Sequence, residues 1–339
     1  MASLHVLLIG GSGFMGRRTA DAMLAAGHRV SVLSRGNVAV DERIETLVAD
    51  RRDSASLARV LEGRTFDFTV DFLVYDAIDV ETLLLVPYAA LGRYVMISTG
   101  QVYLVTDGTQ PPYREQDMDG PVIPAPPEDS PEHGSWAYGV GKRRAERALL
   151  GLRGSHGMRS VALRLPIVQG EGDGTLRLWA YLERMLDGGP LVLPDGGTRL
   201  TRHVDVADVA ATLLRFAESE APRSSAYNLA QPDVVPLREL LERIAHAAGV
   251  TPRFVDASWD EALAAGLDRW FSPYAGPWSS ILDPSRAAAE WGFLGTRTAD
   301  YVPRIVRWHL EHRPKESHFG YPQRALELEF AAKLGASTR

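Results

Sequence analysis

The sequence has no cysteine among its 339 residues. This absence excludes disulfide bonds, thiolate metal ligands and cysteine nucleophiles together. It is typical of a reducing compartment without being unique to one. Near the N-terminus the longest apolar run is residues 6–9 with their neighbours, which is too short for a secretion signal or a membrane span. We therefore expect a cytoplasmic protein with no membrane partner.

An excess of positive charge and several catalytic motifs are also missing. The net charge is −6 and no basic run occurs, so binding to nucleic acid is not expected. Neither a G-x-S-x-G elbow nor a P-loop is present, which excludes the usual serine hydrolases and nucleoside triphosphatases. His309 and His312 lie three residues apart, but no further ligand nearby completes a zinc site. The sequence therefore predicts no metal.

What the sequence does have is a run of glycines directly after its first apolar stretch and before a helical pattern. A strand that enters a helix through glycines lets backbone N–H groups approach a pyrophosphate at the positive end of the helix. The first glycine permits the turn, the second the approach to phosphate and the third the packing of the helix. The run predicts a dinucleotide site, with a plain glycine-rich turn as the alternative. Its cofactor-binding residues are Gly10, Gly13, Phe14, Met15 and Gly16.

Strand and helix patterns alternate through the first half of the chain. Strands are expected at residues 4–9, 29–34, 44–49, 68–73, 94–98 and 160–165. Helices are expected at residues 14–26, 54–61, 80–91 and 138–153. This alternation predicts a doubly wound parallel sheet, whose strand carboxyl ends form one ligand-binding edge. Looser patterns follow, with helices at residues 176–186, 206–218, 237–248 and 301–312 and a strand at 226–230.

The predicted fold class is therefore α/β, a doubly wound parallel (Rossmann) sheet with a smaller mixed α/β substrate domain. The dinucleotide-binding domain is assigned to residues 1–165, with 205–231 returning to it. The substrate-binding part is assigned to 166–204 and 232–315, followed by a C-terminal helical tail at 316–339. Residues 104–135 hold seven of the 21 prolines. We expect this segment to be a lid, with disorder as the alternative.

The end of the second strand indicates which dinucleotide is bound. An acidic residue there accepts from the ribose 2′-OH of NAD, whereas an arginine pairs with the 2′-phosphate of NADP. This chain has Ser34 and Arg35 there and no acid before Asp41. The cofactor is therefore predicted to be NADP, with NAD as the alternative and a solvated Arg35 as the competing interpretation. Asp50, after the third strand, is assigned to the adenine amino group or else to a helix start.

Tyr138 and Lys142 form a Y-x-x-x-K pair on one face of a predicted helix. A cation and an oxidised nicotinamide both favour the phenolate, which lowers the pKa of the tyrosine toward the working pH. The phenol can then exchange a proton with a carbinol while hydride moves to or from the nicotinamide. Ser98 and Thr99 add hydroxyls at the end of a strand on the ligand edge. A purely structural Tyr–Lys pair is the alternative.

Together these motifs resemble the extended short-chain dehydrogenases/reductases, the NAD-dependent epimerase/dehydratase family, over roughly residues 4–300. The resemblance implies that Lys142 also binds the nicotinamide ribose hydroxyls and that Thr99 orients the substrate. It implies that the segment after the sixth strand packs on the nicotinamide. The remaining cofactor-binding residues are thus Ser98, Tyr138, Lys142, Pro166, Ile167 and Val168.

The chain also departs from this family. Sugar 4,6-dehydratases carry an Asp-Glu pair where this chain has Gly100 and Gln101, neither of which is an acid or base near neutral pH. Dehydration by that route is therefore disfavoured. The arginine that binds a nucleotide-sugar diphosphate is replaced by Thr201, and arginines flank that position. The residues assigned to the substrate are Gln101, Gln169, Arg199 and Arg202.

Three functions are consistent with these features. The first is an NAD(P)-dependent oxidoreductase that transfers hydride at a carbonyl or carbinol of a polar small molecule, such as a sugar or sugar-like metabolite. The second is a redox-neutral sugar or nucleotide-sugar epimerase that retains NAD, and the third is a non-catalytic dinucleotide-binding sensor or scaffold. The set Thr99, Tyr138 and Lys142 argues against the third, and Arg35 favours the first because exchangeable NADPH suits net reduction. The expected partner is a small-molecule substrate, and a homodimer is left open.

Overall fold

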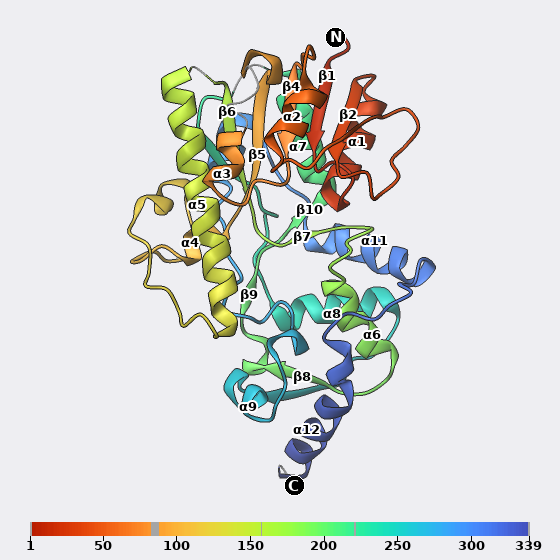
Figure 1. Ribbon diagram of the computed structural model, residues 1–339. Coiled ribbons are helices and arrows are strands. Elements are labelled where there is room, and N and C mark those ends of the chain that lie inside the picture. Colours follow the sequence, from red (N-terminus) through yellow and green to blue (C-terminus); the bar gives the residue numbers. More distant parts are fainter. Residues whose placement is uncertain (1, 83–87, 157, 220–221, 338–339) are drawn as a thin grey trace. The chain divides into compact units, whose positions relative to one another are not determined.

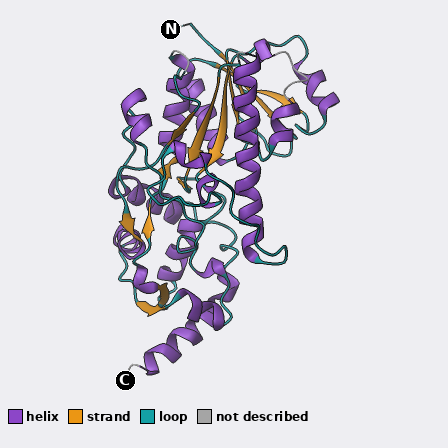
Figure 2. Cartoon of the chain, turned by 90° about the vertical axis from the view of Figure 1, so that its left-hand side faces the viewer, coloured by secondary structure: helices purple, strands orange, loops and turns teal. Residues whose placement is uncertain are grey.

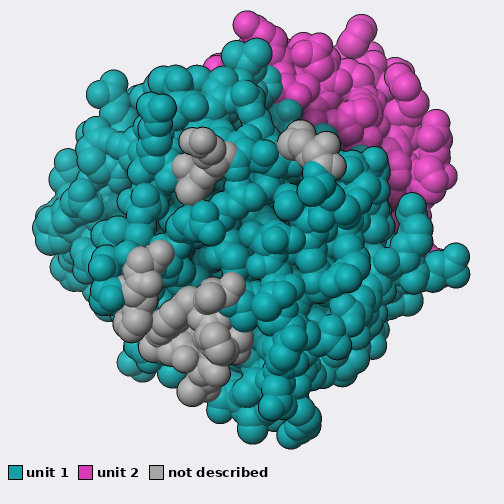
Figure 3. All heavy atoms as spheres, turned by 90° about the horizontal axis from the view of Figure 1, so that it is seen from above, with its two compact units in different colours: residues 1–168, 206–230, 282–295 teal, residues 169–205, 231–281, 296–339 magenta. Residues whose placement is uncertain are grey.

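The computed structural model describes residues 2–82, 88–156, 158–219 and 222–337 (Figure 1). The chain divides into two compact units, which Figure 3 distinguishes by colour. Unit 1 comprises residues 1–168, 206–230 and 282–295, and unit 2 comprises residues 169–205, 231–281 and 296–339. Figure 2 shows that helices make up much of the chain, with the long strands gathered in one sheet.

Unit 1 is built on a seven-stranded sheet in the order β11-β6-β5-β4-β1-β2-β3. Its strands are β1 (His5–Ile9), β2 (Arg29–Ser34), β3 (Glu45–Val48), β4 (Phe68–Asp71), β5 (Arg93–Thr99), β6 (Ser160–Leu165) and β11 (Ala226–Asn228). Every neighbouring pair in this sheet is parallel, which confirms the doubly wound parallel fold. The strand order reverses between β1 and β4, which is the point where ligands bind in such sheets.

Helices cover both faces of this sheet. The α-helices of unit 1 are α1 (Phe14–Ala25), α2 (Ser54–Leu61), α3 (Ala77–Glu81), α4 (Gln101–Leu104), α5 (Pro131–His156), α7 (Val206–Glu218) and α10 (Ser285–Trp291). Leu57 of α2, Val80 of α3 and Leu149 of α5 share one buried cluster with Leu7 and Met96 of the strands. Successive strand residues point to opposite faces, so the neighbours of these strand residues are buried on the face where α1 packs against α7. Because helices cover both faces of the sheet, its strands are almost continuously apolar.

Two expected helices differ from those observed. The helix expected at 138–153 begins at Pro131, seven residues earlier. Gly134 weakens the helix propensity of these added turns, and tertiary contacts such as that of the Trp136 indole with the carbonyl of Ile123 compensate. The helix expected at 80–91 is instead α3 and a 3₁₀ turn at Tyr88–Leu91, and residues 83–87 lie outside the described residues.

The proline-rich segment 104–135 is packed onto unit 1. It contains a 3₁₀ turn at Glu115–Asp119. Indole Nε1 of Trp136 donates to the carbonyl of Ile123 at 3.1 Å. Tyr113 and Met118 belong to a buried cluster with Tyr103 and Leu282. These contacts contradict the disorder alternative, and the action of the segment as a lid stays a prediction.

Unit 2 is a smaller mixed α/β assembly. Its helices are α6 (Arg177–Leu186), α8 (Leu237–Ala248), α9 (Trp259–Ala264), α11 (Thr298–Glu311) and α12 (Arg324–Ser337). Strand β8 (Leu191–Pro194) pairs in parallel with β13 (Phe254–Ala257), and β9 (Leu200–Thr201) pairs antiparallel with β12 (Val235–Pro236). The short strand β10 (Val204–Asp205) also belongs to unit 2, whereas β7 (Val168–Gln169) includes the last residue of a unit 1 segment and the first residue of unit 2.

The C-terminal helix α12 is tied into unit 2 by two ion pairs, of which the second is buried. Arg324 donates to both carboxylate oxygens of Asp187 at 2.7 Å. Glu327 pairs with Arg184 at 3.0 Å, and both side chains are 1% exposed. The structure therefore groups α12 with unit 2, where the sequence suggested a separate tail. It also groups residues 282–295 with unit 1, where the sequence suggested the substrate part.

Within the described residues, no helix is long and apolar enough to cross a membrane. The same residues contain no group of three or more His, Asp or Glu side chains that could hold a metal ion.

Candidate active site

The carboxyl ends of β1, β4 and β5 lie next to one another in the sheet. The register pairs Ile9 with Asp71, and Asp71 with Met96. The glycine run after β1, the residues after β4 and the hydroxyl of Thr99 at the end of β5 are therefore brought to one edge. This is the edge at which the sequence analysis expected the ligand.

Three glycines of the β1–α1 turn are required by the backbone itself. Gly10 has a φ of +79°, and a Cβ on it would lie 2.5 Å from Cγ of Leu73. A Cβ on Gly16 would lie 2.4 Å from Cα of Gly11, so the first turn of α1 rests directly on the loop. A Cβ on Gly11 would clash with Cβ of Leu8 at 2.7 Å. The sequence analysis assigned no role to Gly11, although its adjacency to Gly10 is the signal for it.

Gly13 differs, because no atom of the described residues would clash with a side chain there. Among them, its Cβ would meet the carbonyl oxygen of Gly10 at an ordinary 3.7 Å. Gly13 is the N-cap of α1 and no side chain caps this helix start. Phe14 and Met15 form the first turn and are half-buried. The positive end of α1 is thus uncapped by any described side chain, as a phosphate site requires.

An exposed arginine, Arg35, directly follows β2. Ser34 is buried, and its hydroxyl accepts from the backbone N–H of Gly36 at 3.2 Å. Arg35 is exposed and forms no hydrogen bond or ion pair with any residue that the structure describes. Asp50, after β3, is exposed and accepts from the backbone N–H of Arg52 at 2.9 Å. Arg35 is therefore available to an external anion.

Tyr138 and Lys142 share one face of α5, and Lys142 ties that face to β5. The Lys142 ammonium is buried and donates to the carbonyl of Ile97 at 2.8 Å. It lies 5.8 Å from the centroid of the Tyr138 ring, which is 38% exposed. Thr99, two residues beyond Ile97, accepts from the N–H of Gln101 at 3.2 Å. The predicted catalytic residues are thus gathered around the end of β5.

Burial has a marked effect on the Lys142 ammonium. Desolvation lowers the pKa of Lys142 to about 8, although the carboxylates of Asp71, Glu146 and Asp79 favour its charged form. With this pKa Lys142 stays mostly charged at neutral pH, and a pKa shifted from its ordinary value is common for groups in active sites.

Two glycines between Tyr138 and Lys142 are a signal that the sequence analysis missed. A Cβ on Gly139 would lie 2.8 Å from the carbonyl oxygen of Gln101, and one on Gly141 would lie 2.5 Å from that of Tyr75. The start of α4 and the loop after β4 therefore pack directly against this turn of α5. Glycines inside a helix commonly have such a packing reason.

The Ser98 side chain faces the interior. Its hydroxyl donates to the carboxylate of Glu146. Glu146 in turn pairs with Arg164 at 2.7 Å, with both side chains almost fully buried. Only the Ser98 backbone is left for a cofactor at the edge, which corrects the expectation for its hydroxyl. The half-buried segment Pro166–Val168 follows β6 at the same edge.

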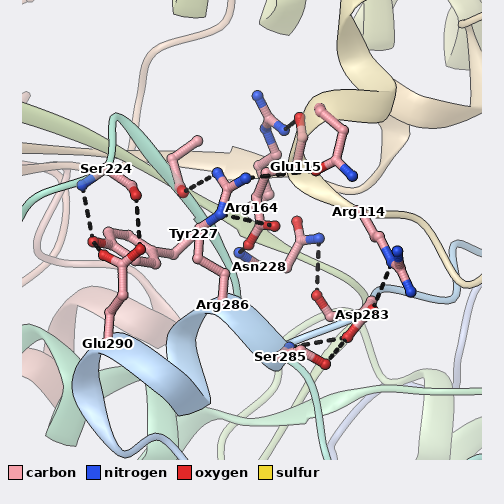
Figure 4. A network of polar contacts seen from close by, with 12 residues as sticks. Arg114, Glu115, Arg164, Ser224, Tyr227, Asn228, Asp283, Ser285, Arg286 and Glu290 are labelled. Atoms are coloured by element: carbon pink, nitrogen blue, oxygen red, sulfur yellow. Dashed lines mark hydrogen bonds and ion pairs between the residues drawn. The ribbon is translucent and has the colours of Figure 1, made fainter.

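The Arg164 network also anchors the proline-rich segment (Figure 4). Arg164 donates to the hydroxyl of Tyr103 and to the carbonyl of Glu115, both at 2.7 Å. The Glu115 carboxylate accepts from the N–H of Asn228 at 2.9 Å and pairs with Arg286 at 3.4 Å. One buried cation thus joins β6, α5 and the segment before α5.

The residues assigned to the substrate fall in both units. Gln101 is half-buried in unit 1. Gln169 is buried in unit 2 and donates to the Tyr274 hydroxyl at 2.6 Å, so its amide is already engaged. Arg202 donates to the carbonyl of Gln231 at 2.8 Å. Arg199, also in unit 2, is half-buried and its carbonyl accepts from Leu237 at 2.8 Å.

A parallel sheet with a glycine turn between β1 and α1, and a Tyr–Lys pair on the helix before β6, are features that define a class of dinucleotide-dependent enzymes. The model of the NAD dependent epimerase/dehydratase family matches residues 6–230. The chain therefore belongs to the NAD-dependent epimerase/dehydratase family of extended short-chain dehydrogenases/reductases. It is an enzyme of the NAD(P)-dependent oxidoreductase/epimerase type.

Similar proteins include both reductases and epimerases. A 2'-dehydrokanamycin reductase from Streptomyces kanamyceticus is 28% identical over 282 residues, 79% of this chain and 76% of that protein. UDP-arabinose 4-epimerase 1 from Arabidopsis thaliana is 23% identical over 353 residues, 91% of this chain and 80% of that protein. The structure of UDP-glucose 4-epimerase from Thermotoga maritima with UDP-glucose has a TM-score of 0.72 at 16% identity, covering 92% of this chain and 100% of that one.

Proposed function

We propose that this enzyme is an NADP-dependent oxidoreductase acting on a carbonyl or carbinol of a polar, sugar-like small molecule. The observation that carries the proposal is the gathering of Thr99, Tyr138 and Lys142 around the end of β5, with the uncapped start of α1 at the same edge. The reductases among its relatives support net hydride transfer.

In this proposal Tyr138 exchanges the proton and Thr99 holds the reacting oxygen. The Tyr138 phenol donates to the carbonyl oxygen during reduction, or accepts from the carbinol during oxidation. The Thr99 hydroxyl donates a hydrogen bond to the same oxygen. Lys142 keeps a positive charge beside the phenol and binds ribose hydroxyls. When bound, the nicotinamide supplies or accepts the hydride.

The residues at positions 100 and 101 limit which reactions the site can catalyse. Gly100 and Gln101 offer no carboxyl group to remove or deliver a second proton. Elimination of water from a sugar by an Asp-Glu pair is therefore not available at this place. The proposal is confined to hydride transfer with one proton exchanged at oxygen.

The residues at the edge fit a dinucleotide. Gly13 leaves room above the start of α1, where backbone N–H groups can bind a diphosphate. Arg35 follows β2 without a partner among the described residues, at a position where an arginine can pair with a 2′-phosphate. Pro166, Ile167 and Val168 offer half-buried apolar surface for the nicotinamide.

Replacing Arg35 with alanine tests the choice of cofactor. We expect Arg35→Ala to weaken NADPH binding by about 10-fold or more while NADH binding changes less than twofold, because a charge-assisted bond is worth about 1.5–3 kcal/mol. Fluorescence titration measures both affinities. Arg43→Ala is the matched control, since exposed Arg43 is held by Asp41 at 2.7 Å. Equal losses for the two dinucleotides in Arg35→Ala would contradict the 2′-phosphate contact.

Replacing Gly13 with alanine separates cofactor binding from folding. The added Cβ has space in the protein, so the free energy of unfolding should change by less than about 1 kcal/mol. The methyl group would instead obstruct the diphosphate, and we expect NADPH affinity to fall at least about 10-fold. Gly151→Ala, on open helix surface, should leave affinity unchanged. Unchanged affinity in Gly13→Ala would place the dinucleotide elsewhere.

A redox-neutral epimerase that retains NAD is the second candidate. It is favoured by the epimerases among the relatives and structural neighbours. Native mass spectrometry of the purified protein discriminates between the two. The oxidoreductase should be isolated free of dinucleotide or with exchangeable NADPH, and it should consume NADPH with a ketosugar or keto-aminoglycoside from a test panel. Stoichiometric NAD that resists dialysis would favour the epimerase.

A further inference from the structure

A second tyrosine, Tyr75, lies against the Tyr138–Lys142 pair. Its ring centroid is 5.2 Å from the Lys142 ammonium nitrogen and 6.4 Å from the Tyr138 ring, to which it is tilted by 51°. The Lys142 nitrogen is itself 5.8 Å from the Tyr138 ring. The two rings and the ammonium are thus in mutual contact, and two aromatic rings approach one buried cation.

Tyr75 is held in this place by its backbone. Its N–H donates to the Asp79 carboxylate at 2.7 Å, and Asp79 is fully buried. Its carbonyl oxygen lies so close to α5 that a Cβ on Gly141 would come within 2.5 Å of it. The next residue, Asp76, is paired with Arg144 of α5. The loop after β4 is therefore fastened to α5 one residue before Lys142.

The Tyr75 ring is only partly covered by protein. The residue is 45% exposed, which is unusual for a large aromatic at such a constrained position. Its hydroxyl has no hydrogen-bond partner within the described part of the chain. What the ring does contact is the catalytic pair.

We propose that Tyr75 is a positioning residue, whose ring face stabilises the Lys142 ammonium beside Tyr138. An aromatic face attracts a cation within about 6 Å, most strongly where water is excluded. Lys142 is 3% exposed and donates to one carbonyl, so a ring face replaces part of its lost hydration. The catalytic consequence rests on the proposed function, because it acts through Lys142.

Other charged groups also face Lys142. Asp71 at the end of β4, Asp79 of α3 and Glu146 of α5 favour the ammonium, whereas Arg51, after β3, opposes it. All of them are buried, and we expect them to keep their places when the Tyr75 side chain is replaced. A change in the titration of Lys142 in a Tyr75 variant therefore reports the ring.

The chain is suited to measuring this directly, because it has only three lysines, Lys142, Lys315 and Lys333. The experiment is a ¹³C-lysine NMR titration of the whole protein without added dinucleotide, with Lys142→Met to assign the signal. Tyr75→Leu removes the ring and Tyr75→Phe keeps it. Ile78→Ala is the control, since Ile78 is an exposed apolar residue nearby that is 54% exposed.

In Tyr75→Leu we expect the Lys142 midpoint to fall by about half a pH unit. Tyr75→Phe and Ile78→Ala should stay within about 0.2 units of the wild type. The alkaline limit of turnover should move to lower pH together with the midpoint in Tyr75→Leu. Should that variant not fold, Tyr75→Met removes the ring with an unbranched side chain.

An unchanged or raised midpoint in the folded ring-less variant would overturn the proposal. So would an equal shift in Tyr75→Phe, because that would assign the effect to the hydroxyl. The NMR result does not depend on turnover. If Tyr138→Phe proved fully active, the proposed function would fail while the contact between Tyr75 and Lys142 could still be established.

Discussion

Replacing Tyr138 with phenylalanine is expected to lower kcat by about 10³–10⁴-fold, the upper part of the range for general acid–base catalysis. The phenol is the group that exchanges a proton with the substrate oxygen in the proposed reaction. The ring itself remains and keeps its place beside Lys142 and Tyr75. NADPH affinity should therefore change less than threefold. Steady-state consumption of NADPH and fluorescence titration measure the two quantities.

The same deletion of a hydroxyl elsewhere provides the control. Tyr321→Phe removes a hydroxyl that donates to Asp187 in unit 2, and kcat should stay within twofold of the wild type. A Tyr138→Phe enzyme with near-wild-type kcat would exclude the phenol as proton donor. A parallel loss of NADPH affinity and kcat would instead indicate that Tyr138 acts in binding.

Replacing Arg164 with methionine is expected to destabilise the protein by about 3–5 kcal/mol. Arg164 and Glu146 have side chains that are 3% and 4% exposed. Burial opposes the charge of Arg164, yet Glu146 and Tyr103 raise its pKa above the ordinary value, so it stays ionised. Without Arg164 the Glu146 carboxylate is left buried with one hydrogen bond, from the Ser98 hydroxyl, and no directly paired cation among the described residues. Equilibrium unfolding in urea measures the loss.

An exposed pair serves for comparison. Arg144 pairs with Asp76 with side chains 57% and 31% exposed, and Arg144→Met should cost less than about 1 kcal/mol. Adding Glu146→Leu to Arg164→Met removes the unpaired charge and should recover part of the stability. Equal losses in Arg164→Met and Arg144→Met would show that the buried pair contributes no more than a surface one.

The sheet could be predicted because its strands are apolar and bounded by clear turns. The strands at residues 29–34 and 160–165 have the predicted bounds, since covered faces impose an uninterrupted apolar pattern. The N-terminal turns of α5 could not be predicted in this way. These turns, residues 131–137, contain Gly134, which has low helix propensity, and Trp136, whose indole N–H donates to the carbonyl of Ile123, a contact that no sequence pattern shows.

The candidate site was predictable where spacing alone places groups together. Tyr138 and Lys142 are four residues apart, so any helix puts them on one face. The direction of the Ser98 side chain was not predictable, because it follows from a carboxylate on α5 and an arginine on β6. Tyr75 belonged to no motif, and only the loop after β4 brings it to Lys142.

The order of strands and helices, the glycine turn and the Tyr–Lys spacing are local patterns, and they determined the class of fold and the chemistry proposed for it. Only the tertiary structure decided which side chains are left available at the ligand edge. Gly13 and Arg35 are open to a ligand, whereas Ser98 and Gln169 are engaged by buried partners. The reason is that hydrogen-bond partners of buried polar groups come from segments far apart in the chain, and sequence spacing does not encode those pairings.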